Sequence, residues 1–150
     1  MSTATVGIVL VSHSAELAAG AAHLAAQVSG GTVTIIAAGG TDEGDLGTSA
    51  AKVADGLRHA DQGAGVVVLP DLGSAVLTVK AVLEDYSAAA TVLLADAPFV
   101  EGAVAATVTA AAGGDVKAVA AAAEVMRGAA PHPVPLPASG EREGPASAGG

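Results

Sequence analysis

The stretch VGIVLVSHS, Val6 to Ser14, decides the fold. Its apolar part, Val6–Val11, is unbroken, as is typical of a parallel strand that is buried on both faces. A helical period follows at once over Ser14–Val28, with an apolar face at spacings of four, three and four made by Leu17, Ala21, Leu24 and Val28. Gly30 and Gly31 then end the helix. His13 therefore lies where a buried strand turns into a helix.

The same alternation continues along the chain. Further apolar runs predict strands at Thr32–Ala38, Gly65–Leu69 and Thr91–Ala95. Helical patterns predict helices at Thr48–Ala60, at Ser74–Tyr86, after Pro98, and from an Asp115 cap to Arg127. This order predicts an α/β fold, with a doubly wound open parallel sheet of strand order 2-1-3-4 and helices on both of its faces.

The last part of the chain has a different composition. Residues 128–150 hold five of the seven prolines and show no apolar periodicity. We therefore predict one domain over residues 1–127, followed by a disordered tail rich in Pro, Gly and Ala over residues 128–150.

Composition excludes several classes of function. The net charge is −9 with only six Lys or Arg residues, which argues against a nucleic-acid partner or an anionic membrane surface. There is no cysteine, which excludes disulfides, thiolate metal sites and cysteine nucleophiles. The first apolar run lacks a basic region before it, and the most apolar window, residues 88–112, is broken by Asp96, Pro98 and Glu101. We expect a cytoplasmic protein.

Two residues flank the point where the winding of the predicted sheet reverses, which is where open α/β sheets bind their ligands. His13 follows the first strand and Asp71 follows the third. A carboxylate on one imidazole nitrogen fixes the tautomer and leaves the other nitrogen free as a nucleophile. Asp71 as a simple helix N-cap is the alternative.

Glycines and hydroxyls gather at the same edge of the sheet. Paired glycines allow close backbone approach to a ligand, and helix starts are ready anion sites. The serines beside His13 can instead be plain helix caps. The phosphoryl- or partner-binding residues that we expect are Ser12, Ser14, Gly39, Gly40, Thr41, Thr48, Ser49, Gly73 and Ser74.

Several familiar sites are absent from the sequence. It has no Gly-Lys-Ser/Thr phosphate loop, no GxGxxG fingerprint and no EF-hand spacing. Its histidines lie far apart, so we expect no metal site. A histidine nucleophile with an orienting carboxylate and no nucleotide pocket indicates a phosphohistidine carrier that docks to proteins. A non-catalytic regulatory domain that binds a small anion is the alternative.

Four blocks in order carry a resemblance to a known family: GIVLVSHS (7–14), AAGGTDEGDLGTSA (37–50), GVVVLPDLGSA (65–75) and LLADAPFVEGAV (93–104). Together they resemble the phosphotransferase subunit of phosphoenolpyruvate-dependent dihydroxyacetone kinases, which has the mannose-type enzyme IIA fold. The resemblance covers roughly Thr5 to Arg127. The third block, PDLGSA, is shorter than in mannose-type transporter subunits, which favours the kinase branch over an enzyme IIA of a sugar transporter.

The resemblance implies a function for each main residue. His13 is the phosphorylated residue and Asp71 orients it. The phosphoryl group comes from phosphoenolpyruvate through the phosphocarrier HPr, with no bound cofactor, and passes to ADP on the nucleotide-binding subunit of the kinase. The acidic loop Asp42–Asp45 is then a partner-facing surface. The resemblance also implies a homodimer, for which the last helix and the segment Phe99–Val108 are candidate surfaces.

Overall fold

A computed structural model describes residues 4–86 and 91–128. Its strands are β1 (Gly7–Ser12), β2 (Ile35–Gly39), β3 (Val66–Pro70) and β4 (Val92–Leu94). Its helices are α1 (Ala15–Ser29), α2 (Ala50–Ala60), α3 (Gly73–Asp85), α4 (Phe99–Ala111) and α5 (Val116–Gly128). All nine predicted elements are present, although β2 begins at Ile35, three residues later than predicted. Gly128 is the last residue of α5, and the rest of the predicted tail, 129–150, lies outside the described residues.

The four strands form one parallel sheet in the order β2-β1-β3-β4, which confirms the predicted topology. Val9 of β1 is paired with Ile36 of β2 on one side and with Val68 of β3 on the other. The chain therefore winds outward from β1 in both directions. As a result, the residues that follow β1 and β3 lie next to each other at the carboxyl edge of the sheet.

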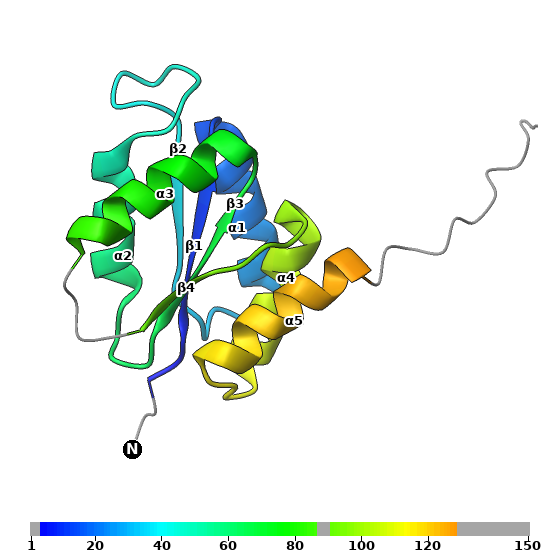
Figure 1. Cartoon of the computed structure of the whole chain (residues 1–150). Helices are drawn as coiled ribbons and strands as arrows, with labels where there is room; N and C mark the ends of the chain where they lie inside the picture. The colour runs from blue at the N-terminus through cyan, green and yellow to red at the C-terminus, as the bar shows by residue number, and fades with distance from the viewer. Residues whose placement is uncertain (1–3, 87–90, 129–150) are drawn as a thin grey trace, which may run out of the picture.

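Helices cover both faces of the sheet, with α2 and α3 on one side and α1, α4 and α5 on the other (Figure 1). Alternate residues of β1 serve the two cores: Ile8 and Leu10 pack under α1, α4 and α5, whereas Val9 and Val11 pack under α2 and α3. Every residue of β1 and β3 is buried. This double burial explains why both strands are unbroken apolar runs in the sequence.

The apolar face that the spacing indicates for α1 is not the face that packs on the sheet. Leu17, Leu24 and Val28 are 43 to 48% exposed, and the buried side chains are instead Ala18, Ala21 and Ala25. The helix lies too close to β2 for larger side chains, because a Cβ added to Gly39 would lie 2.5 Å from the Ser14 carbonyl oxygen. The prediction was therefore wrong for the two leucines and Val28, and right for Ala21.

Candidate active site

The structure brings His13 and Asp71 together at the reversal point of the sheet. Asp71 is held there by its backbone N–H, which donates to the Val11 carbonyl at 2.9 Å and continues the pairing of β3 with β1. Nδ1 of His13 lies 3.0 Å from Oδ1 of Asp71. The imidazole is 24% exposed and the carboxylate 8% exposed. The histidine can therefore meet a partner, while the aspartate contacts mainly the protein.

Three donors fix the Asp71 carboxylate. Its Oδ2 accepts from the Ser12 hydroxyl at 2.8 Å and from the His13 backbone N–H at 3.1 Å, and its Oδ1 faces the imidazole. Burial alone would raise the pKa of Asp71, but these hydrogen bonds and the nearby imidazole outweigh it and hold the pKa below the ordinary 3.8. Asp71 is consequently ionised at neutral pH and acts only as an acceptor.

The two nitrogens of His13 have different environments. Because the ionised carboxylate only accepts, the proton of the neutral imidazole lies on Nδ1. Nε2 is then the nitrogen with a free lone pair, and it lies 2.5 Å from the Ser74 hydroxyl at the start of α3. The hydroxyl donates in this contact. The arrangement leaves Nε2 as the ring nitrogen that could act as a nucleophile.

The N-terminus of α3 is left open beside Nε2. Its N-cap is Leu72, which supplies no capping side chain, and its first turn holds no acidic residue. The first N–H groups of a helix have no partner within the helix, and they carry partial positive charge. An anionic group attached to Nε2 would therefore meet a favourable field from α3.

Other predicted site residues have their hydroxyls engaged elsewhere. The Ser14 hydroxyl caps α1 by accepting from the Leu17 N–H at 3.2 Å. The Ser49 hydroxyl caps α2 and donates to Asp42 at 2.5 Å. The Thr41 hydroxyl accepts from a backbone N–H within its own loop. In this state of the protein none of the three hydroxyls bonds to His13 or Asp71.

The long loop after β2 nevertheless touches the site. The Gly47 N–H donates to the His13 carbonyl at 2.9 Å, and Gly40, at φ 75°, pairs with Thr48 in a short parallel bridge. The Thr48 hydroxyl is buried without a hydrogen-bond partner among the described residues. Gly39, whose role was predicted to be ligand contact, allows the close approach of β2 to α1. The loop therefore supports the His13 backbone.

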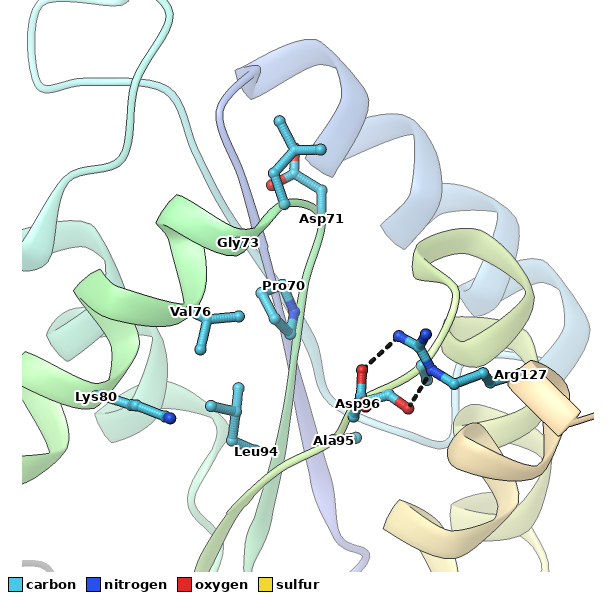
Figure 2. A pocket seen from close by; sticks show the side chains of 11 residues that line it. Pro70, Asp71, Gly73, Val76, Lys80, Leu94, Ala95, Asp96 and Arg127 are labelled. Carbon is cyan, nitrogen blue, oxygen red and sulfur yellow. Dashed lines mark hydrogen bonds and ion pairs between the residues drawn. The ribbon is translucent and has the colours of Figure 1, made fainter.

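A pocket of about 510 Å³ opens on the other side of Asp71, between the start of α3, the end of β4 and the end of α5 (Figure 2). Its floor is apolar and includes Pro70 and Leu94. Lys80 and an exposed ion pair between Asp96 and Arg127 form its polar rim. The pocket reaches Asp71, and His13 is not among the residues that line it.

Three residues that line this pocket were not predicted as site residues from the sequence. Arg127 reaches the β4–α4 connection only because α5 packs against that end of the sheet, which periodicity does not reveal. Lys80 could have been singled out by scarcity, since it is one of only six Lys or Arg residues in the chain. Asp96 could have been found by its place directly after the fourth strand, by the reasoning that singled out Asp71.

The structure describes residues 4–86 and 91–128, and two kinds of site are absent from these ranges. They contain no cluster of three His, Cys, Asp or Glu side chains placed to hold a metal ion. No helix within them is long and apolar enough to cross a membrane.

Comparison with known proteins identifies relatives over most of the chain. It is 38% identical over 105 residues to the phosphoryl donor subunit DhaM of PEP-dependent dihydroxyacetone kinase 2 of Listeria innocua, covering 69% of this chain and 84% of that one. It is 32% identical to the phosphotransferase subunit DhaM of the PTS-dependent dihydroxyacetone kinase of Lactococcus lactis. That match covers 81% of this chain and 96% of the relative. It is 41% identical to the Escherichia coli donor subunit DhaM over 76% of this chain, but spans only 25% of that longer protein.

A solved structure shares the fold. The crystal structure of a protein of unknown function superimposes with a TM-score of 0.73 and 33% sequence identity, over 81% of this chain and 94% of that chain. Residues 7–120, which run from β1 to the first five residues of α5, match the EIIA-man family, described as the PTS system fructose IIA component. The chain therefore belongs to the EIIA-man family.

Proposed function

We propose that this protein is the phosphoryl carrier subunit of a dihydroxyacetone kinase, with Nε2 of His13 as the carrier atom. One observation supports this assignment above the others: the Asp71 carboxylate holds Nδ1 at 3.0 Å while Nε2 faces Ser74 and the open end of α3. The curated relatives described above are all donor or phosphotransferase subunits of such kinases. They favour this function over a sugar-transporter subunit or a non-catalytic anion-binding domain.

The proposed reaction has two transfers that balance at Nε2. In the first, the Nε2 lone pair forms a bond to phosphorus while the P–N bond of phosphorylated HPr breaks and its electron pair returns to the donor nitrogen. Nδ1 keeps its proton, and Asp71 stabilises the positive charge that develops on the imidazole. In the second, an oxygen of the ADP β-phosphate attacks phosphorus and the Nε2–P bond breaks. The chain is thus a carrier within a phosphotransferase.

Two exposed leucines flank the nucleophile and support docking to proteins. Leu46 is 80% exposed and precedes Gly47, whose N–H bonds to His13. Leu72 is 59% exposed and follows Asp71 directly. Asp42 and Asp45 lie in the same loop as Leu46, so a partner with basic groups around an apolar patch would fit this surface. We propose HPr as the donor, the ADP-binding subunit as the acceptor, and a homodimer as the assembly.

Phosphoryl labelling tests the proposal. The full chain is incubated with labelled phosphoenolpyruvate, enzyme I and HPr, and the label is expected on an acid-labile, base-stable site. His13→Gln should remove the label completely, whereas His23→Gln, which changes an exposed histidine on α1, should keep it. Addition of the ADP-binding subunit with ADP should then discharge the label. Undiminished labelling of His13→Gln would overturn the proposal.

A further inference from the structure

Ser12 has a buried hydroxyl that takes no part in the two transfer steps described above. It is the last residue of β1, and the whole residue is buried; among the described polar residues, Thr107 is the other one that is wholly buried. The Thr107 hydroxyl donates to the Ala103 carbonyl one helical turn earlier, which satisfies it within α4. Ser12 lies in a strand and cannot do the same. Its hydroxyl instead joins two parts of the active site.

The direction of the two Ser12 hydrogen bonds is fixed by their partners. The Ser14 N–H can only donate, and it lies 3.0 Å from the Ser12 oxygen, which must therefore accept. The Ser12 proton is left to point at Oδ2 of Asp71, 2.8 Å away. The Ser14 amide thus orients the Ser12 hydroxyl, and the hydroxyl in turn orients the carboxylate.

We propose that Ser12 is a positioning residue, whose hydroxyl holds the Asp71 carboxylate turned so that Oδ1 keeps the His13 proton on Nδ1. Oδ2 already accepts two hydrogen bonds, from Ser12 and from the His13 backbone, so Oδ1 is the oxygen left for the imidazole. This inference rests on the proposed function of His13. It differs from the role in phosphoryl binding that the sequence predicts for Ser12, because the buried hydroxyl is used within the protein.

Removal of the hydroxyl should release both of its partners. In Ser12→Ala, Oδ2 loses one of its two donors and the Ser14 amide loses its acceptor, so the carboxylate can rotate away from Nδ1. The imidazole then populates both neutral tautomers, and the fraction with a free Nε2 lone pair falls. Charge-assisted hydrogen bonds of this kind are the stronger ones, so we expect phosphorylation by HPr to slow by about tenfold or more.

The test compares Ser12→Ala, Ser12→Thr and Thr107→Val in the full chain. Imidazole ¹⁵N spectra report the tautomer of His13, and a phosphorylation time course reports the rate. Ser12→Ala should show mixed tautomers and slow transfer, and Ser12→Thr, which keeps a hydroxyl, should recover both. Thr107→Val removes a buried hydroxyl that bonds only within α4, so it controls for stability alone and should leave the tautomer and the rate unchanged.

Asp71→Asn separates this inference from the proposed function. If Ser12→Ala keeps the wild-type tautomer and a rate within twofold while Asp71→Asn is severely slowed, the Ser12 role is overturned and the function stands. If His13→Gln still takes up label, the function itself fails. In the unaltered protein, the Ser12 hydroxyl proton should exchange slowly and couple to the Asp71 carboxyl carbon. Rapid exchange of that proton with water would contradict the inference even if no Ser12 variant folds.

Discussion

The starts of α1 and α3 lie at the same edge of the sheet, yet only α1 is closed by a side chain. Ser14 caps α1, and Glu16 adds a carboxylate to its first turn. α3 begins after Leu72 with no side-chain cap and no acidic residue in its first turn, and Ser74 turns its hydroxyl toward His13. At the start of α1, a serine accepts a hydrogen bond from a backbone N–H and a glutamate balances the partial positive charge. The start of α3 has neither of these and faces Nε2. We attribute the difference to function, since capping of α3 would fill the place of the phosphoryl group.

A side-chain cap on α3 would remove the difference between the two helix starts, and we expect it to have the largest effect on the rate of phosphorylation. Leu72→Asp places a capping carboxylate at the start of α3, which should stabilise the fold by about 1 kcal/mol, as N-caps do. The same charge repels an incoming phosphoryl group, so phosphorylation by HPr should slow by roughly tenfold or more. Thermal unfolding and a labelling time course measure the two effects.

Two matched variants isolate the charge in that experiment. Leu72→Asn caps without a charge, and Leu72→Ala removes only the exposed apolar side chain. We expect both to label faster than Leu72→Asp. Equal rates for the Asp and Asn variants would show that the open end of α3 does not act on the phosphoryl group.

Removal of the cap from α1 should have an effect of intermediate size, on the stability of the fold. Ser14→Ala leaves the first amides of α1 unsatisfied and should lower the free energy of unfolding by about 1 kcal/mol. Chemical denaturation measures this loss. The rate of phosphorylation should change much less, because the Ser14 side chain is engaged with Leu17. A rate that falls by tenfold with no loss of stability would instead support the phosphoryl contact that the sequence predicts for Ser14.

The smallest effect concerns the pH dependence of stability through Asp71. Its pKa is lower in the folded chain than the ordinary value, so its contribution is complete above the unfolded pKa of about 3.9 and is lost as pH falls through the folded pKa. The difference in melting temperature between wild type and Asp71→Asn should therefore narrow as the pH falls below about 4. If the difference in melting temperature stays constant in acid, the hydrogen bonds to the Asp71 carboxylate do not stabilise the folded protein.

The sequence was sufficient for the fold and for the central pair of residues. Unbroken apolar runs at β1 and β3 predicted a doubly buried parallel sheet, and the rule for reversal points placed His13 opposite Asp71. The packed face of α1 was not predictable, because leucine spacing does not reveal that β2 approaches so closely that alanine must fill the contact. The choice between Nδ1 and Nε2 also required coordinates, since it depends on which nitrogen faces the carboxylate.

The roles of the serine residues were the hardest to predict from the sequence. Ser12, Ser14, Ser49 and Ser74 all lie beside strand ends or helix starts, and each could cap or bind an anion. In the structure two of them cap helices, one supports Asp71 and one faces Nε2. Such differences depend on side-chain rotamers and on a few ångströms of backbone position, which residue type and spacing do not specify.

The contact between Ser74 and Nε2 has a consequence for the resting protein. As long as the hydroxyl donates to Nε2, the lone pair of the nucleophile is masked, and small electrophiles in solution meet a histidine of reduced reactivity. Rotation of the serine side chain, whether spontaneous or on the arrival of a docked donor, uncovers the atom. We therefore expect Ser74→Ala to leave Nε2 of His13 more accessible to small electrophiles than it is in the wild-type protein.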